Sequence, residues 1–488
     1  MATTTEISPY WRNYVAGRWV DAVDGQRCGL LDPATAEPLA EVALGGVADV
    51  DAAVAAARAC ADSRALVSVR PVQRLRWVMG IGRELASRRD RAAYVLSRDS
   101  GKALSEAYTE IDGTIRYFEY YGSMADKLEG QYIPLGDGYV DYTVPVPHGV
   151  SAHVIPWNYP AEMVGRGIAP ALAAGNAVVI KAPELDPLVC HLVVEAAETV
   201  GLPDGAINLI VGDGPVAGAA LVEHPGVDHI VFTGSVATGQ SIMHAAADRV
   251  VPTVMELGGK SAAIVFDDAD LDALVESTRW GIFTNAGQVC SAMSRMIVTP
   301  DVHDEVVDRV TALGRGLTVG AGVDDAELTP VVSAGQLERV SGFVERAVAE
   351  GAGAAGGGAV IDRAGYFMEP TVLVDLDPHA DVARSEVFGP VLSVLKADSA
   401  EQAITIANGT DYGLAAGVFT RDIDRALWTA ERLAAGQVYV NEWFAGGVET
   451  PFGGIKRSGF GREKGQEALH NYVQTKNVGV RVRGPRHR

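Results

Sequence analysis

Apolar residues recur at helical spacing in the first quarter of the chain and then give way to a different pattern. From residue 47 to 130, apolar positions such as Val50 and Val54 lie three or four residues apart, which predicts helices. Between residues 131 and 150, tyrosines and valines mix with prolines, a composition typical of extended chain. A helical N-terminal part is therefore expected to lead into a strand-like segment.

Beyond this segment, short apolar runs alternate with stretches that are compatible with helices. Each run ends in a turn residue, so the rhythm predicts parallel sheets with helical crossovers. Two groups of such units predict two α/β domains. The expected strands are Val150–Ile155, Ala177–Ile180, Ile207–Val211 and Ile230–Phe232 in the first group, and Ala263–Phe266, Arg295–Val298, Val391–Val394, Gly417–Phe419 and Gln437–Val440 in the second.

Charge and cysteine content narrow the possible classes of function. The 488 residues carry 41 basic and 62 acidic side chains, a net charge of −21 that disfavours nucleic acid and anionic membranes as partners. Four cysteines without a C-x-x-C pair predict free thiols, no structural zinc and a cytoplasmic location. No signal peptide is recognised, and the longest apolar stretch, between Arg166 and Lys181, is too short and interrupted to span a bilayer, so we expect it to be buried.

Two segments that follow apolar runs could bind a nucleotide. Gly234–Ser241 nearly matches a P-loop but has Gln240 in place of the lysine, which disfavours NTP hydrolysis. Its backbone N–H groups could still hold a pyrophosphate, or the segment could be an ordinary strand-to-helix turn. Lys181 and Glu184 could face the ligand crevice of a parallel sheet or form a surface ion pair. In the first case, the carboxylate would bind ribose hydroxyls and favour NAD over NADP.

Three further residues could carry chemistry. Cys290 lies among small residues and an amide, which suggests an accessible thiol, although most cysteines are buried as small hydrophobes. Glu256 stands between Met255 and Leu257, where a carboxylate could be a buried base with a raised pKa. Asn158 follows an apolar run, and its amide could donate to an oxyanion or form a turn.

Taken in order along the chain, these segments resemble the NAD(P)-dependent aldehyde dehydrogenase superfamily. The resemblance extends from about residue 10 to about residue 478. It rests on Val154–Pro160, Lys181–Glu184, Phe232–Ser235, Glu256–Lys260, Gly287–Cys290, Glu386–Pro390 and Pro451–Gly459.

The resemblance implies an α/β fold with two Rossmann-like parallel-sheet domains and a small β oligomerisation element. That element implies a homodimer or homotetramer formed partly by sheet pairing between subunits. The implied division assigns 1–124, 148–257 and 447–468 to the NAD-binding domain, 258–446 to the catalytic domain with Cys290, and 125–147 with 469–488 to the oligomerisation element.

The resemblance also implies oxidation of an aldehyde to a carboxylic acid without a metal. Cys290 would attack the aldehyde to give a thiohemiacetal, and loss of hydride would leave a thioester. The amide of Asn158 and the backbone N–H of Cys290 would form the oxyanion hole. Glu256 would activate the hydrolytic water, and Glu463 matches a position sometimes assigned to a proton relay. We also count Lys181 among the catalytic residues.

The implied cofactor is NAD, with NADP less favoured. Lys181 and Glu184 match contacts to the adenosine ribose, Gly214 lies on the adenine side, and Glu386 and Phe388 match contacts to the nicotinamide ribose. The full expected set is Ile155, Pro156, Trp157, Lys181, Glu184, Gly214, Phe232, Thr233, Gly234, Ser235, Leu257, Glu386 and Phe388.

The substrate pocket implied by the resemblance is rich in aromatic residues, which favours an aromatic or apolar aldehyde. Arg166 departs from this character and resembles the arginine of succinic semialdehyde dehydrogenases, although Thr284 replaces their usual second arginine. A carboxylated semialdehyde is therefore an alternative, and a simple helical pair between Arg166 and Glu162 is another interpretation. The expected lining is Tyr159, Met163, Arg166, Val289, Ser291 and Phe452, together with Trp443 and Phe444.

A cysteine-dependent esterase is the alternative from another reaction class. It would use Cys290 and Glu256, but no histidine stands in either motif to act as the usual partner base.

Overall fold

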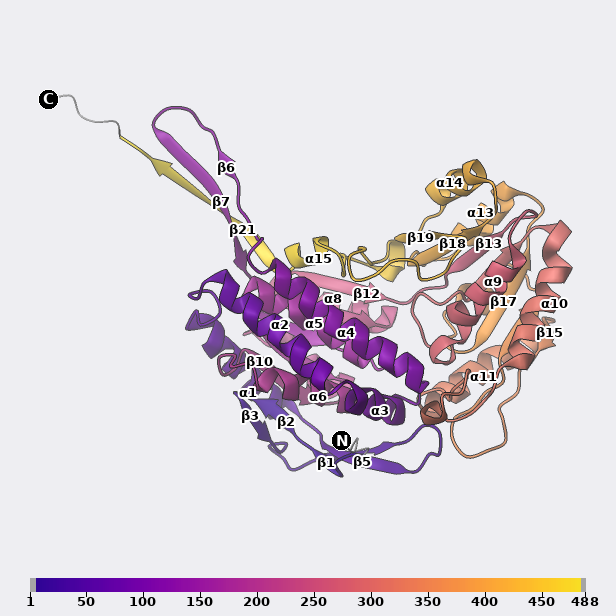
Figure 1. Ribbon diagram of the computed structural model, residues 1–488, viewed down its shortest axis with the longest axis horizontal. Helices are drawn as coiled ribbons and strands as arrows, with labels where there is room; N and C mark the ends of the chain where they lie inside the picture. Colours follow the sequence, from indigo (N-terminus) through magenta and orange to yellow (C-terminus); the bar gives the residue numbers. More distant parts are fainter. Residues whose placement is uncertain (1–5, 484–488) are drawn as a thin grey trace.

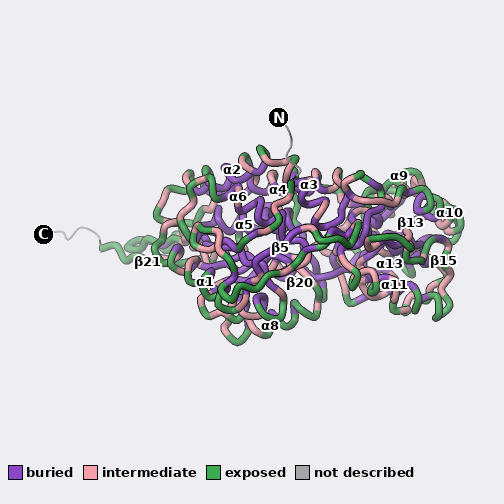
Figure 2. The backbone as a smooth tube through the Cα atoms, turned by 90° about the horizontal axis from the view of Figure 1, so that it is seen from below, coloured by how far each residue is buried: buried purple, intermediate pink, exposed green. Residues whose placement is uncertain are grey.

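The computed structural model describes residues 6–483, which form two lobes and a narrow projecting arm (Figure 1). Each lobe contains one largely parallel sheet with helices packed against it, so the predicted α/β class with two parallel-sheet units is confirmed. Buried chain fills both lobes, whereas the last strand of the arm is mostly exposed (Figure 2).

The sheet of the first lobe has eight strands in the order β20-β12-β11-β8-β9-β10-β2-β3. Its five central strands run parallel, and their order reverses between β8 and β11. In such sheets a crevice forms at the reversal, outside the carboxyl ends of the strands. The strands are β2 (Asn13–Val15), β3 (Arg18–Val20), β8 (Val150–Val154), β9 (Ala177–Ala182), β10 (Ile207–Val211), β11 (His229–Gly234), β12 (Thr253–Leu257) and β20 (Gly459–Phe460).

Helices cover both faces of this sheet. On one face, α1 (Val47–Asp62) packs against β9 and β10, and α8 (Val236–Arg249) packs against β11 and β12. On the other face lie α5 and α6, and behind them α2, α3 and α4, which are the remaining helices of residues 47–130, add a further layer. The helices of this side are α2 (Pro71–Ser87), α3 (Arg89–Ser100), α4 (Leu104–Met124), α5 (Pro160–Ala174) and α6 (Leu188–Glu198); α7 is Ala219–Glu223 and α15 is Glu467–His470.

Helix α5 lies at the centre of this layer. It begins with Pro160 at its first turn, and Gly175 ends it in a left-handed conformation (φ 102°). Gly165 lets α4 approach closely, because a Cβ there would lie 2.9 Å from Thr114 Cγ2. The apolar stretch between Arg166 and Lys181 becomes the rest of α5 and β9, which are buried as predicted.

The second lobe has a seven-stranded sheet in the order β15-β16-β17-β14-β13-β18-β19. The five strands expected here from the sequence are present within a few residues of their predicted ends. They are β13 (Ala262–Val265), β14 (Arg295–Val298), β17 (Val391–Lys396), β18 (Ala415–Phe419) and β19 (Gln437–Val440), joined by β15 (Gly353–Gly356) and β16 (Thr371–Val374); the helices are α9 (Leu271–Thr278), α10 (Pro300–Gly316), α11 (Ala334–Ala349), α12 (Asp381–Arg384), α13 (Ala400–Asn408) and α14 (Ile423–Arg432).

The arm is an antiparallel sheet of β6 (Tyr132–Ile133), β7 (Tyr139–Pro147) and β21 (Val473–Arg481). β7 and β21 pair along their whole length and extend away from the first lobe (Figure 1). A smaller sheet of β1 (Tyr10–Trp11), β5 (Pro38–Ala43) and β4 (Arg27–Leu31) lies near the N-terminus. Within residues 6–483, every helix is too short or too polar to span a bilayer.

Candidate active site

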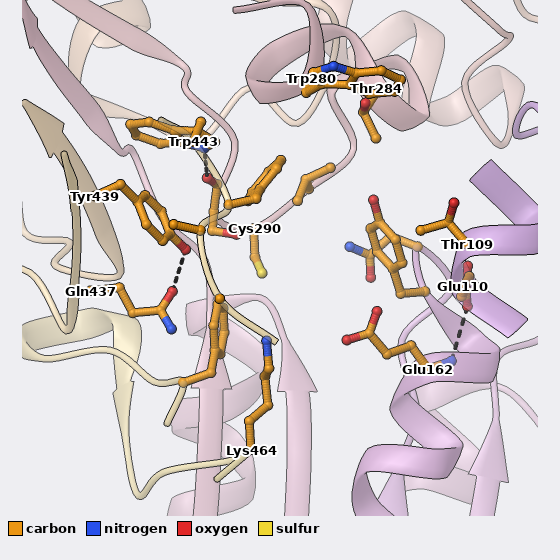
Figure 3. Close-up of a pocket in the computed structure, with 18 of the residues that line it drawn as sticks. Thr109, Glu110, Glu162, Trp280, Thr284, Cys290, Gln437, Tyr439, Trp443 and Lys464 are labelled. Carbon is orange, nitrogen blue, oxygen red and sulfur yellow. Dashed lines mark hydrogen bonds between the residues drawn. The ribbon is translucent and has the colours of Figure 1, made fainter. Parts of the chain in front are cut away.

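A cavity of about 690 Å³ is lined by both lobes. The first lobe contributes residues of α4 and α5, and the second contributes residues near Cys290 and after β19 (Figure 3). Cys290, Asn158 and Glu256 all line this cavity, so the structure brings the three predicted catalytic groups together. The expected pocket residues line it as well, namely Tyr159, Met163, Arg166, Val289, Ser291, Phe452, Trp443 and Phe444.

Cys290 follows a sharply bent segment. Asn285 (φ 49°) and Ala286 (φ 52°) have left-handed conformations, as does Gly287 (φ 72°). A Cβ on Gly287 would lie 2.1 Å from the carbonyl oxygen of Gly389, so only glycine fits at this bend. Burial raises the pKa of the Cys290 thiol to about 12. The resting side chain is therefore a neutral thiol, and its attack requires a proton acceptor.

The amide of Asn158 is held against the loop that precedes Cys290. Its Nδ2 donates a hydrogen bond to the carbonyl oxygen of Gln288 at 3.0 Å. The backbone carbonyl oxygen of Asn158 accepts hydrogen bonds from Lys102 Nζ and Asn285 Nδ2, both at 3.0 Å. Asn158 is 8% exposed, so its amide has a fixed orientation and one remaining Nδ2 hydrogen.

Glu256 lies on β12 in very different surroundings. Neither carboxylate oxygen accepts a hydrogen bond from any residue in the described part of the chain. Burial and the neighbouring carboxylate of Glu463 raise the pKa of Glu256 well above its usual range. Gly453 makes room for the side chain, because a Cβ there would lie 2.8 Å from Glu256 Oε1. A carboxylate in this setting is a strong base when ionised.

Arg166 does not form the ion pair with Glu162 that their helical spacing allowed; it pairs with Glu463 instead. Its Nε lies 2.6 Å from Glu463 Oε2, and both side chains are buried. Glu162 instead accepts a hydrogen bond from the Tyr117 hydroxyl at 3.0 Å, because the first turn of α5 faces α4. Phe452 and Glu463 exchange backbone hydrogen bonds, and Arg166 also lies 4.4 Å from the ring centroid of Phe452. Tertiary pairing therefore replaces the local pair.

Most residues expected to bind the cofactor lie at the carboxyl edge of the first sheet. Lys181 Nζ and Glu184 Oε2 form an ion pair at 3.0 Å, and the amide of Ile155 donates to the carbonyl of Lys181. Phe232 packs against Gly234, where a Cβ would lie 2.6 Å from the ring, and Ser235 caps α8. This edge therefore has a close glycine turn, a helix N-terminus and a carboxylate.

The remaining members of that set approach from the second lobe or lie farther out. Glu386 Oε1 accepts from the amide of Gly259 at 3.0 Å, and burial raises the pKa of Glu386 to about 7. Phe388 packs edge-on against Trp157, with ring centroids 5.2 Å apart. Gly214 is exposed beyond the end of β10.

The expected cofactor residues of the first sheet differ in their relation to the cavity. Thr233 lines the cavity, whereas Pro156, Leu257 and Lys181 do not.

Sequence reasoning missed several lining residues. Glu106, Thr109 and Glu110 are three and four positions apart on α4, so they share one face of that helix, and this polar face is a signal that could have indicated a lined cavity. Trp280 and Tyr439 carried no comparable signal. Gln437, Glu442 and Lys464 also line the cavity. Within residues 6–483, no cluster of three or more His, Cys, Asp or Glu side chains could hold a metal ion.

Residues 19–478 match the sequence model of the aldehyde dehydrogenase family. The chain is 37% identical over 476 residues to the chloroplastic betaine aldehyde dehydrogenase of Beta vulgaris, covering 95% of each. It is 38% identical over 482 residues to the mitochondrial benzaldehyde dehydrogenase of Antirrhinum majus, covering 98% of this chain and 90% of that one. The structure of a Bacillus cereus aldehyde dehydrogenase in complex with NAD+ is 36% identical, covers 98% of this chain and 99% of that chain, and has a TM-score of 0.96.

Proposed function

We propose that this chain, which belongs to the aldehyde dehydrogenase family, oxidises an aldehyde to a carboxylic acid through a covalent intermediate on Cys290, with NAD as the hydride acceptor. One observation carries the proposal: a thiol, a held amide and a carboxylate without a hydrogen-bond partner among residues 6–483 line the same cavity. These are the three groups that attack on a carbonyl, stabilisation of an oxyanion and activation of water require.

The carboxyl edge of the first sheet fits a dinucleotide. Glu184 would bind the adenosine ribose, Ser235 and the adjoining amides of α8 would hold the pyrophosphate, and Glu386 would bind the second ribose. When bound, NAD supplies an acceptor for the hydride that leaves the substrate carbon. The carboxylate of Glu184 would repel the 2′-phosphate of NADP, so we propose a preference for NAD.

The protein groups act in two stages. In the first stage, the Cys290 thiol gives its proton to solvent water and its sulfur attacks the aldehyde carbon, while the Asn158 amide and the Cys290 N–H stabilise the oxyanion. Departure of hydride leaves a thioester on Cys290. In the second stage, Glu256 takes a proton from water, the resulting hydroxide adds to the thioester, and the C–S bond breaks to release the acid.

An aromatic or apolar aldehyde is the substrate class that the cavity favours. Its lining includes the rings of Tyr159, Trp280, Tyr439, Trp443, Phe444 and Phe452. The negative charge of Glu463 balances the positive charge of Arg166. This lowers the free-energy cost of binding a neutral substrate beside that guanidinium. A relative that is 38% identical is named benzaldehyde dehydrogenase, and this supports the same class.

A carboxylated semialdehyde is a second candidate, favoured by one specific observation. Arg166 lines the cavity, and its Nη2 has no hydrogen-bond partner among residues 6–483. A substrate carboxylate could occupy that position, since guanidinium and carboxylate pair strongly.

An NADH-formation screen separates these candidates. Benzaldehyde, hexanal, 4-carboxybenzaldehyde and succinic semialdehyde are each supplied with NAD and with NADP, and p-nitrophenyl acetate is supplied without cofactor. We expect the highest kcat/KM with benzaldehyde and NAD. A higher kcat/KM with the carboxylated aldehydes would replace the first substrate class with the second. Ester hydrolysis without NADH formation from any aldehyde would replace the dehydrogenase with an esterase.

We also propose that the arm mediates assembly into a homodimer or homotetramer and that the protein works in the cytoplasm. Several large apolar side chains of the arm are exposed, which supports an interface. The four cysteines, two of them buried, are all free, which fits a reducing compartment. The exposed apolar residues of the arm are Tyr132, Leu135, Tyr139, Val140, Tyr142, Val480 and Val482.

A further inference from the structure

A buried ion pair lies beside the cavity, outside the catalytic set. Lys102 follows the end of α3, and Glu110 is on α4. Their side chains contact each other and are 1% and 0% exposed. Removing two charges from water is costly unless they make further hydrogen bonds, so the partners of this pair indicate what it does.

Both members of the pair hold the same turn of the chain. Lys102 Nζ donates to the carbonyl oxygen of Asn158 at 3.0 Å and lies 4.1 Å from the ring centroid of Tyr159. Glu110 Oε1 accepts from the amides of Ala161 at 2.9 Å and Glu162 at 3.1 Å, in the first turn of α5. The contact of Glu110 with that turn is drawn in Figure 3. The pair thus fixes the backbone on both sides of Pro160.

This backbone position determines where the Asn158 amide points. The Asn158 side chain has only two rotatable bonds, and its Nδ2 reaches the carbonyl of Gln288, two residues before Cys290. Asn285 holds the same Asn158 carbonyl from the other side, at 3.0 Å. If Lys102 were apolar, that carbonyl would lose its charged donor. Glu110 would also remain buried without its counter-ion.

We propose that Lys102 and Glu110 are positioning residues that hold the Asn158 amide in the orientation needed to stabilise the oxyanion beside Cys290. This inference rests on the proposed function, in which Asn158 is an oxyanion donor. Neither residue transfers a proton or bonds to the substrate in this role. Their removal should therefore slow formation of the thioester without changing the affinity for NAD or the accessibility of the Cys290 thiol.

The first test uses Lys102→Met in the full-length protein. Rapid mixing with benzaldehyde and NAD measures the rate of the NADH burst. We expect that rate to fall about 100-fold, near the loss of one oxyanion donor. The dissociation constant for NADH, measured by fluorescence titration, and the rate of Cys290 alkylation by iodoacetamide should change less than about twofold. A burst rate within threefold of wild type, or a parallel loss of NADH affinity, would overturn the positioning role.

A second variant and a matched control distinguish a loss of positioning from misfolding of the variant. The double variant Lys102→Met/Glu110→Gln removes both charges, so no unpaired charge stays buried, and it should show the same loss of burst rate. The control is Arg89→Met, because Arg89 and Asp112 also join α3 to α4, at 2.5 Å, but are roughly half exposed and away from the cavity. We expect the control to keep the wild-type burst rate. An equal loss in this control would mean that helix packing, rather than Asn158, is responsible.

A double-mutant cycle links the pair to Asn158 directly. If Lys102 acts through the amide, Lys102→Met should cause less than a threefold further loss of burst rate in an Asn158→Ala background. If the loss of burst rate in the double variant equalled the product of the losses in the two single variants, the proposal would be contradicted. The failure of the proposed function has a different signature, since wild-type protein would then form no NADH from any aldehyde.

Discussion

The two sides of the cavity are organised in opposite ways. On the side of Asn158, the amide and carbonyl groups are hydrogen-bonded, and the charges of Lys102 and Glu110 cancel in a buried pair. On the side of Glu256, a buried carboxylate has no hydrogen-bond partner among residues 6–483 and lies near a second carboxylate, Glu463. This difference indicates that the two sides serve different steps of the proposed reaction.

A side held by hydrogen bonds suits a group that must not move while charge develops on the substrate. An unbonded carboxylate suits a group that must take up and release a proton. Under the proposed function, formation of the thioester would depend on the Asn158 side and its hydrolysis on the Glu256 side. Substitutions on the two sides should have separable kinetic effects.

The largest effect should come from Cys290, on which both sides act. Cys290→Ala removes the atom that forms the covalent intermediate, so we expect kcat to fall by more than about 10⁴-fold. NADH binding, measured by fluorescence titration, should be retained. Dehydrogenase turnover close to that of wild type would exclude the covalent mechanism.

On the bonded side, Asn158→Ala should slow the first stage. Loss of one oxyanion donor costs about 2.7–4 kcal/mol of barrier, so the NADH burst rate should fall about 10²- to 10³-fold. Hydrolysis of a preformed thioester also passes through an oxyanion, and steady-state turnover should decrease as well. A burst rate equal to that of wild type would show that Asn158 has no part in the first stage.

On the unbonded side, Glu256→Gln should slow the second stage. A general base contributes about 10²- to 10⁴-fold, so steady-state turnover should fall at least about 100-fold while the NADH burst persists. The pH profile is a second readout. Because the pKa of Glu256 is raised, the base is lost as pH falls through a value well above the usual range of a carboxylic acid. Wild-type deacylation should thus rise with pH, and the variant should lose this dependence.

The smallest effect should come from Arg166, which modulates the unbonded side. Its positive charge lowers the pKa of Glu256, so Arg166→Met should shift the deacylation profile to higher pH. At pH 7 we expect turnover to fall, by less than the loss of about 100-fold expected for Glu256→Gln. Arg166→Met/Glu463→Gln is the matched control, because it avoids leaving Glu463 buried without a counter-ion. A profile unchanged in both variants would remove Arg166 from the proton chemistry.

Much of the fold could be predicted from the sequence because the signals are local. Runs such as Ile207–Val211 and Arg295–Val298 are apolar, of strand length and bounded by turn residues, and both strands have the predicted ends. The family prediction is also confirmed, since it rests on ordered motifs rather than on any single residue.

The parts that could not be predicted depend on contacts between distant segments. Arg166 pairs with Glu463 rather than Glu162 because the chain near Phe452 returns to the first lobe and brings the buried carboxylate under α5. Likewise, the spacing of Lys102 and Glu110 along the chain gives no sign that both would hold the turn at Asn158. Periodicity identifies which residues are buried but does not identify their partners.

The most direct test of the central claim is a search for the covalent intermediate on Cys290. Glu256→Gln is mixed with benzaldehyde and NAD, quenched in acid after the NADH burst, and analysed by intact and peptide mass spectrometry. We expect a benzoyl adduct on the peptide that contains Cys290, in an amount that matches the NADH of the burst, and no adduct in Glu256→Gln/Cys290→Ala. NADH formation by Glu256→Gln without any acyl group on Cys290 would contradict the account.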